Sequence, residues 1–494
     1  MSEILFDDSA HNSDAEDLQK ALLAPGSAGE LYSTAGGSLT NQSLEGMLSS
    51  LTLKQSDFTI WQDISKTKGS STVLEYAQET GLGISDAGSF VQQMGNPEFR
   101  DPDFVKGIAQ IKFMSEGWQA SHVAMATDTI IDEKTKMQRS AMSRLLRSVN
   151  TSLFTGDSSL NPMSFDGIAK TISSEGGTDQ VRDMRGGNLT IGTLDIAGQI
   201  IFDANGEVDN SKVYMSAGGV NNLSKLLQNG AGTNRNIIES GEKGITLGGE
   251  VNNIRTSFGI MQKRVDKTLG MAYENKRVPQ YKNSAGALVE GATSDNAPSM
   301  PAITLTNQTG VTGSYFTTGV VRPAGVKYGY RVVSKNSNGS SIACAEVVST
   351  SVVADGGAVS ISIQPFVGDS ASKLPSYYEI YSTKVGESGT YRYMTSIAAN
   401  ATNALSPVAY VDKNDYIPET ARMFVVDQTT SGEARVMNFH QLMPIHNVDL
   451  AKMGNYDQGL INLWGTPMFY KPNSLVEIRN IGVDQTAPNI YNVI

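Results

Sequence analysis

The chain has 494 residues, 39% of them hydrophobic and 18% charged, so it has enough apolar material for several packed cores. Its 50 acidic and 39 basic residues give a formal net charge of −11, which argues against a dedicated nucleic-acid-binding surface because such surfaces cluster Lys and Arg. The single cysteine, Cys344, excludes an intramolecular disulfide framework, and no apolar run reaches the roughly 18 residues needed to cross a bilayer.

The first 69 residues predict two weakly packed segments. Residues 1–24 carry six acidic side chains against Lys20 alone and end before Pro25-Gly26, where a helix would stop. Residues 25–69 indicate an extended N-terminal arm. Because the N-terminus is acidic where a secretory signal would be basic, we expect a soluble protein made in a reducing cytoplasm.

A long two-stranded loop is predicted over residues 70–126. Strand-like runs at 73–77 and 108–113 flank a tip that is too polar and too rich in glycine to form a core. A compact monomer rarely needs such a hairpin, so we expect it to grip another molecule.

An amphipathic helix is predicted over residues 128–155. Its apolar residues recur at three- and four-residue steps along one face, whereas lysines and arginines occupy the other. We expect Gly156 to end this helix in the left-handed conformation that glycine tolerates. The apolar positions are Ile130, Met137, Ala141, Leu145, Val149 and Leu153.

An α+β body is predicted from residues 127–296 and 419–494, interrupted by an all-β domain at 297–418. The intervening segment shows only short alternating β runs separated by turns, the spacing of an immunoglobulin-like or fibronectin-like sandwich. In the body we expect helices at 194–202 and 220–227, and strands at 212–215, 251–256, 259–265, 424–426, 439–444 and 475–482.

Several short runs mark the ends of these elements. Leu153–Asp157 and Phe165–Ile168 surround the end of the long helix, Val411–Ala421 leaves the insertion, and Phe439–Pro444 and Val476–Asn480 close the body. In this order, over residues 55–485, they resemble the major capsid proteins of tailed bacteriophages, whose fold herpesvirus shells also use. The pattern is most similar to that of Twort-like large myophages, which carry a β insertion near the C-terminus.

The resemblance implies the tailed-phage major capsid fold, with an N-terminal arm, an extended loop, a spine helix, and peripheral and axial domains. It implies assembly with itself, as hexamers and pentamers, into an icosahedral shell around double-stranded DNA that it touches only by weak, non-specific contact. Portal, scaffold, maturation protease and decoration protein are the further partners implied, and no membrane. The expected location is the virion capsid, after synthesis in the bacterial host cytoplasm. Residues 1–24 would be a candidate propeptide.

The search for catalytic, cofactor-binding or metal-ligating residues assigns none. His440 and His446 are six residues apart with Pro444 between them, unlike the ligands of a zinc helix. Gly83–Ala87 nearly matches a nucleophile elbow, but Ala87 replaces its final glycine. The acidic pair Asp132-Glu133 most simply stabilises a helix N-terminus. We therefore expect a structural protein and not an enzyme.

Two other functions remain open. The fibronectin-like pattern would also suit an extracellular adhesin or tail-associated binding protein, although no signal peptide is recognised and the module interrupts another domain. A glycoside hydrolase with a β accessory domain would need two carboxylates in a cleft lined by aromatic residues. Only three tryptophans are present, so sugar-stacking platforms look scarce.

Overall fold

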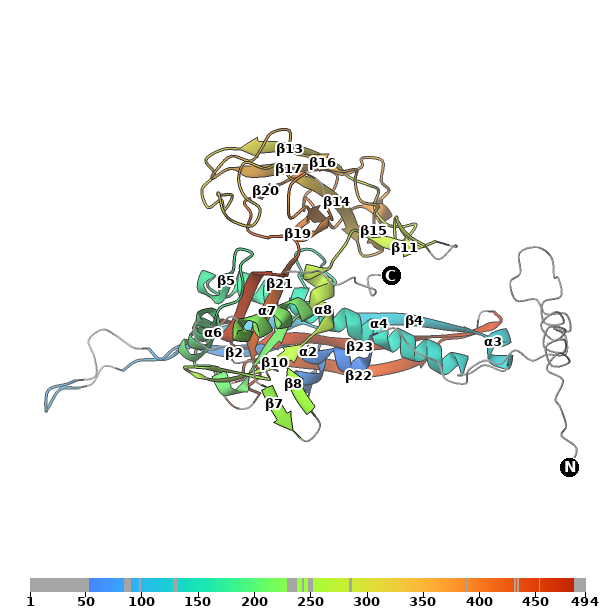
Figure 1. Ribbon diagram of the computed structural model, residues 1–494. Coiled ribbons are helices and arrows are strands. Elements are labelled where there is room, and N and C mark those ends of the chain that lie inside the picture. Colours follow the sequence, from blue (N-terminus) through green and yellow to red (C-terminus); the bar gives the residue numbers. More distant parts are fainter. Residues whose placement is uncertain are drawn as a thin grey trace, which may run out of the picture. The chain divides into compact units, whose positions relative to one another are not determined.

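A computed structural model of the chain describes residues 53–83, 90–96, 99–127, 132–228, 238–241, 244–247, 252–283, 287–387, 389–430, 432, 435–452 and 454–483. All of them except Thr127 and Asp132 belong to one compact unit. The predicted acidic segment 1–24 and residues 25–52 of the predicted arm lie outside the described residues. The described residues contain both helices and strands, which confirms the predicted mixture of α and β structure (Figure 1).

A mixed six-stranded sheet, ordered β5-β24-β21-β6-β10-β9, forms one part of the body. Its central strands come from both sides of the insertion, because β21 (Thr420–Asp427) pairs antiparallel with β6 (Ser211–Met215) and with β24 (Leu475–Gly482). Helix α6 (Ile191–Asp203) contributes Leu194, Ala197 and Ile201 to the core of this sheet. The other elements here are β5 (Val181–Asp183), α7 (Ala217–Gln228), β9 (Asn253–Thr256) and β10 (Gly259–Val265).

A four-stranded sheet, ordered β1-β22-β23-β4, packs against the long helix α4 (Glu133–Thr155). Four positions of the predicted apolar face, Ala141, Leu145, Val149 and Leu153, are buried, which confirms the helical period. The first predicted position, Ile130, lies outside the described residues. The strands are β1 (Lys66–Lys68), β4 (Lys112–Ser121), β22 (Met437–Asp449) and β23 (Tyr456–Phe469).

Gly156, which follows the last residue of α4, has no room for a side chain and does not adopt the left-handed conformation. A Cβ atom at Gly156 would lie 2.6 Å from the carbonyl oxygen of Ser152 and still closer to that of Phe165, and its φ is not in the left-handed range. The predicted mechanism of termination is therefore wrong. The apolar members of the two runs around this junction, Leu153, Phe154, Phe165 and Ile168, are all buried in one core.

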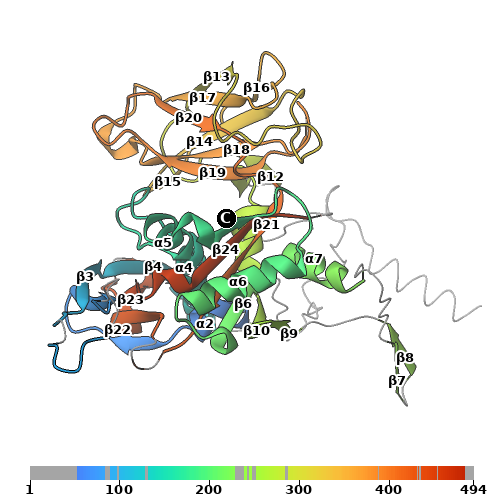
Figure 2. The ribbon, with the colours of Figure 1, turned by 90° about the vertical axis from the view of Figure 1, so that its left-hand side faces the viewer.

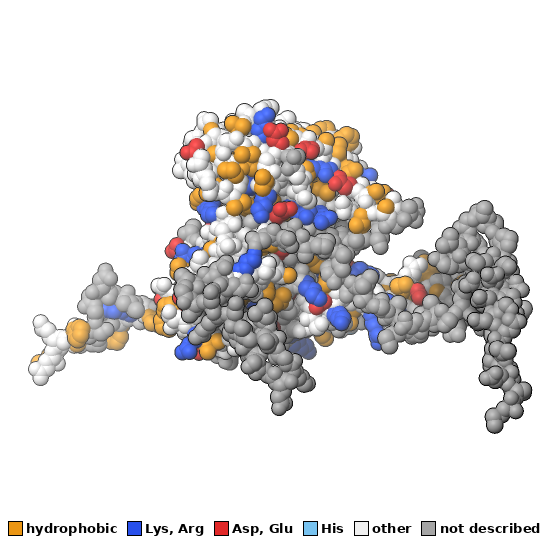
Figure 3. Space-filling view, viewed as in Figure 1, with side chains coloured by type: hydrophobic (Ala, Val, Ile, Leu, Met, Phe, Trp, Pro, Cys, Tyr) orange, Lys and Arg blue, Asp and Glu red, His pale blue; other side chains and the backbone are white. Residues whose placement is uncertain are grey.

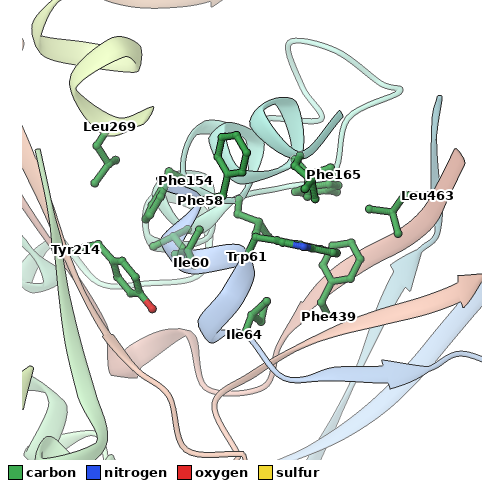
Figure 4. Close-up of a cluster of buried hydrophobic side chains, with 14 of the residues drawn as sticks. Phe58, Ile60, Trp61, Ile64, Phe154, Phe165, Tyr214, Leu269, Phe439 and Leu463 are labelled. Carbon is green, nitrogen blue, oxygen red and sulfur yellow. The ribbon is translucent and has the colours of Figure 1, made fainter. Parts of the chain in front are cut away.

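The segment before β1 is packed and is not an extended arm. Helix α2 (Thr59–Asp63) buries Ile60 and Trp61, and Trp61 meets the ring of Phe439 edge-on at 5.1 Å (Figure 4). The amide oxygen of Asn150 on α4 accepts the backbone N–H of Trp61 at 3.1 Å. The arm predicted over 25–69 is therefore wrong for residues 53–68. Phe58, Ile60, Trp61 and Ile64 supply too much apolar surface to remain in water.

The two-stranded ribbon is shorter than the loop predicted over residues 70–126. Strand β2 (Val73–Gly81) pairs with β3 (Asp103–Gln110), from Val73 opposite Gln110 to Gly81 opposite Asp103. Beyond Gln110 the chain enters β4, which pairs with β23 along its whole length, from Lys112 to Ser121. Alternation alone could not distinguish a ribbon strand from a sheet strand, because both expose one face.

Residues 302–412 form two antiparallel sheets that enclose a separate core, seen at the top of Figure 1 and Figure 2. We call these residues the β domain. One sheet has the order β13-β17-β20, and the other has the order β15-β14-β18-β19 with β16 also paired to β14. The strands are β13 (Ala302–Gln308), β14 (Gly329–Asn336), β15 (Gly339–Ser340), β16 (Val347–Val348), β17 (Ala358–Gln364), β18 (Tyr377–Ser382), β19 (Arg392–Ala398) and β20 (Val408–Asp412).

The core of the β domain contains a fully buried ion pair. Arg322 donates to Asp412 at 3.0 Å, and the side chains of both residues are 0% exposed. Arg322 also donates to the hydroxyls of Tyr330 (3.2 Å) and Ser382 (2.9 Å), while Tyr330 donates to Asp412 at 2.7 Å. Cys344 is buried in the same core as a free cysteine.

Short elements connect these parts. They are η1 (Gln55–Asp57), α3 (His122–Ala126), α5 (Ile168–Ser174), η2 (Thr178–Gln180), η3 (Val208–Asn210), β7 (Ile238–Gly241), β8 (Gly244–Leu247), α8 (Lys267–Leu269), the π-helix η4 (Gly270–Glu274), β11 (Gln280–Lys282), β12 (Leu288–Glu290), η5 (Ala371–Lys373) and η7 (Pro472–Ser474).

Candidate functional site: an apolar ribbon and a charged junction

The β2–β3 ribbon exposes large apolar side chains to solvent (Figure 3). Phe104 and Ile108 on β3 are 66% and 63% exposed, and Phe90 and Phe99 near the tip are 99% and 94% exposed. Val73, Val91, Met94 and Val105 add to this set, which we call the ribbon surface. Exposed apolar clusters of this kind mark sites where another protein binds.

The backbone of the ribbon also offers hydrogen-bonding edges. Within the described residues β2 and β3 pair only with each other, so the outer edge of each strand has unpaired N–H and C=O groups. A strand from another chain could extend the ribbon at either edge. Partway along the ribbon, Gln78 of β2 donates to the carbonyl oxygen of Tyr470 at 2.7 Å, which holds this part of the ribbon to the body.

A second feature is a network of charges where the β domain meets the body. Lys276, which follows the π-helix η4, donates to Glu379 on β18 at 2.7 Å, and Lys335 on β14 pairs with the same carboxylate at 3.0 Å. Burial alone would raise the pKa of Glu379, but the charges of Lys276 and Lys335 outweigh it and lower that pKa to about 2. The two lysines therefore hold a buried carboxylate in its ionised form.

Aromatic rings hold further cations at this junction. The guanidinium of Arg422 on β21 lies 4.0 Å from the ring centroid of Tyr273 and 4.9 Å from that of Tyr416. Arg422 also pairs with Glu477 of β24 at 3.4 Å. The Lys276 ammonium lies 4.0 Å from the ring centroid of Tyr393. These contacts fix the cations in position before any partner arrives.

Asn480 links the end of the insertion to the six-stranded sheet. Its amide donates to Asp183 and to the carbonyl oxygen of Asp415, both at 2.8 Å, and its oxygen accepts the backbone N–H of Ile417 at 3.0 Å. Asn480 adopts a positive φ of 56°, which asparagine tolerates better than most residues. The Asn480 side chain thus connects β24, β5 and the segment between β20 and β21 that leaves the β domain.

The segment before the predicted start of the insertion also packs on the β domain. Arg331 forms a two-pronged pair with Glu290 at 2.9 and 2.6 Å, and Thr293 donates its backbone N–H to the carbonyl oxygen of Ser340 at 3.0 Å. The backbone N–H of Tyr393 donates to the carbonyl oxygen of Lys276, also at 3.0 Å. The boundary predicted at residue 297 therefore falls inside a packed region that begins near Lys276.

A cavity of about 540 Å³ lies within this junction. Its wall runs from the end of α4 and helix α5, past the segment that follows η4, to β14, β18 and β19 of the β domain. We call it the junction cavity. Its charged lining residues are Arg147, Lys170, Lys276, Arg277, Lys335, Arg422 and Arg479, with Asp157, Glu379 and Glu477.

His440 and His446 each contact groups of the surrounding fold. His440 shares hydrogen bonds with Thr67 (3.1 Å) and Tyr470 (2.8 Å), whereas His446 contacts the carbonyl oxygen of Pro444 at 2.9 Å. Most of the elbow-like run 83–87 lies outside the described residues, and Glu133 is the first residue of α4. Among the described residues, three or more His, Cys, Asp or Glu side chains never gather in a metal-binding cluster.

Helices in the described part of the chain are too short or too polar to span a bilayer.

Sequence reasoning missed the junction cavity and the long strand β23. Only the apolar residues Ile461 and Leu463, with Asn462 between them, hinted at that strand. The pairing of Lys276 with Glu379 joins residues 103 positions apart and left no local signal.

Comparisons with known proteins agree with the predicted resemblance. The chain is 24% identical to the major capsid protein of Staphylococcus phage S25-3 and 23% identical to that of Staphylococcus phage K. Each alignment spans 453 residues and covers 90% of both chains. No protein-family model matches. Among solved structures, the capsid of cyanophage P-SCSP1u has a TM-score of 0.43 and 10% identity, covering 92% of this chain and 96% of that one. The predicted resemblance to major capsid proteins of tailed phages is confirmed by the sequence relatives.

Proposed function

We propose that this chain is a major capsid protein that assembles with copies of itself into the icosahedral shell of a tailed bacteriophage. The observation that carries this proposal is the similarity to phage major capsid proteins along 90% of both chains. The β domain spans residues 302–412, so an alignment of 453 residues must extend through the body as well. We expect the protein in the virion capsid.

The exposed apolar residues of the ribbon surface support self-assembly as the function of this chain. Fully burying one exposed side chain such as Phe104 or Ile108 against a neighbour stabilises the contact by roughly 1.5–3 kcal/mol. A closed shell repeats each contact many times, so individually modest interfaces suffice. Hexamers and pentamers of this chain are the expected building units, with portal, scaffold, maturation protease and decoration protein as further partners.

The finer assignment of the fold is part of this proposal. We assign α4 as the spine helix, the β2–β3 ribbon as the extended loop, and the four- and six-stranded sheets as the peripheral and axial domains of a tailed-phage capsid fold. We interpret the β domain as an immunoglobulin-like or fibronectin-like sandwich, which its two antiparallel sheets support.

A structural role fits the junction carboxylates better than glycoside hydrolysis does. A paired-carboxylate mechanism needs one acid whose pKa is raised, so that it holds a proton for the leaving group. Lys276 and Lys335 instead outweigh the effect of burial and lower the pKa of Glu379 to about 2. Glu477 is paired with Arg422 at 3.4 Å, and Asp157 with Lys170 at 3.2 Å.

Negative-stain electron microscopy of the purified full-length chain tests the proposal. Shells, hexamers or curved sheets are the expected result. A chain that stays monomeric under all assembly conditions and binds a glycan would instead favour the adhesin or tail-associated binding protein. Deleting Gln78–Pro97 should leave a folded subunit that cannot close shells, because it removes the tip of the ribbon.

We further propose that the β domain faces outward, because an inward domain would compete with packaged DNA for volume. Protease treatment of intact particles should then cut the turn at Asn338-Gly339 before any site in α4. If that turn is cut only after the particles are disrupted, the β domain faces the interior.

A further inference from the structure

We propose that the junction cavity binds a small polyanion of phosphate chemistry and thereby clamps the β domain to the body. Its volume of about 540 Å³ falls within the range of ligand sites, roughly 300–1,000 Å³. Its lining belongs to both the body and the β domain, so a ligand in it would contact both. The inference does not depend on shell formation.

The first argument is the charge of the lining. Seven lysine and arginine side chains and three carboxylates line the cavity, an excess of four positive charges that falls to three once the pairing of Arg479 with Asp183 is counted, in a chain whose net charge is −11. Each carboxylate already has a cationic partner within 3.4 Å. A concave wall with an excess of one sign of charge concentrates ions of the opposite sign.

The second argument is a pair of arginines with buried nitrogens that lack hydrogen-bond partners in the described structure. Arg277 lines the cavity, and its Nε is buried without a hydrogen-bond partner among the described residues. Arg392 is 3% exposed, and its Nε and Nη1 likewise lack hydrogen-bond partners in the described structure, although Glu419 lies 3.5 Å from Nε. Burial and then the neighbouring charge of Arg277 lower the pKa of Arg392, against the opposing charge of Glu419. The buried Nε of Arg277 is thus a free N–H donor at the cavity wall, and an anion in the cavity could accept its hydrogen bond.

The third argument concerns which anion fits. Guanidinium groups match phosphate oxygens with two parallel N–H donors, and several cations around one cavity favour a ligand with more than one negative charge. Tyr273, Tyr393 and Tyr416 hold Arg422 and Lys276 in place, so little ordering is needed on binding. An inorganic phosphate chain and a nucleoside triphosphate share this chemistry.

The test is isothermal titration calorimetry of unassembled full-length chain with inorganic tripolyphosphate. We expect saturable binding at one site per chain. Arg277→Gln should weaken it about tenfold or more, because it removes a charge-assisted hydrogen bond, whereas Arg277→Lys should retain part of the affinity. The matched control is Arg255→Gln, which removes an exposed arginine outside the cavity and should leave binding unchanged.

The titrations and variants distinguish the possible explanations of binding. Absence of saturable binding, or equal affinities for Arg277→Gln and the unaltered chain, would overturn the proposal. A second titration with ATP distinguishes the sources: equal affinity assigns the cavity to inorganic phosphate chains, and tighter ATP binding assigns it to nucleotides. Circular dichroism of each variant checks that it is folded. A further variant, Lys170→Gln, removes a second lining cation at helix α5 and should also weaken tripolyphosphate binding. A chain that binds tripolyphosphate but forms no shells would contradict only the proposed capsid function.

Discussion

Replacing Arg322 by methionine should unfold the β domain while leaving the body intact. The substitution keeps most of the side-chain volume but leaves the carboxyl group of Asp412 buried and without its cation. Breaking a buried ion pair from one side costs about 3–5 kcal/mol. For a domain of this size, each kcal/mol lowers the Tm by about 4 °C, so we expect a decrease of roughly 12–20 °C.

The positions of the tryptophans allow the two parts to be followed separately. Trp61, Trp118 and Trp464 all lie outside the β domain, in or beside the four-stranded sheet. Thermal unfolding of Arg322→Met followed by tryptophan fluorescence should therefore match that of the unaltered chain. Circular dichroism should show an early transition that the unaltered chain lacks.

A second variant isolates the charge as the cause. The double variant Arg322→Met with Asp412→Asn removes the buried charge, and the amide oxygen introduced at position 412 can still accept the backbone N–H of Asn414, which Asp412 accepts at 2.8 Å. We expect this variant to recover about 2 kcal/mol or more of the loss. The reasoning is refuted if Arg322→Met lowers the free energy of unfolding of the β domain by less than about 1 kcal/mol. It is also refuted if the transition temperature followed by tryptophan fluorescence decreases as much as the one followed by circular dichroism.

Three further predictions concern other parts of the molecule. The double variant Phe104→Ser with Ile108→Ser should change subunit stability by less than about 0.5 kcal/mol, because both side chains are exposed. Electron micrographs of this variant should nevertheless show no closed shells. The matched control, Phe366→Ser with Val367→Ser, changes two exposed residues of the β domain and should assemble normally. Trp61→Ala should cost about 3–5 kcal/mol in denaturant unfolding, because it empties a packed core position; a cost below about 1 kcal/mol would contradict the burial of α2. Because the folded-state pKa of Glu379 is depressed to about 2 from an ordinary 4.5, its contribution is present above pH 4.5 and lost as pH falls toward 2. Glu379→Gln should flatten stability across that acid range, and an unchanged acid-unfolding profile would contradict this assignment.

The sequence by itself determined the features that depend on local periodicity. The apolar face of α4 follows from spacing in the chain, as does the alternation of β17, because helices and strands repeat every 3.6 and 2 residues. The pair β9–β10 likewise follows from two adjacent runs joined by a short turn. The resemblance to capsid proteins depended on the order of such elements, which the chain displays directly.

Only the tertiary structure decided which surfaces these elements meet. Residues 53–68 looked like an arm until the packing of Trp61 against Phe439 showed a core, and β4 looked like part of a ribbon until its pairing with β23 was known. The junction cavity arises from Lys276, Glu379 and Arg422, which lie far apart in sequence. Their pairing depends on how the β domain closes onto the body, since charge attraction acts through space and leaves no repeat along the chain.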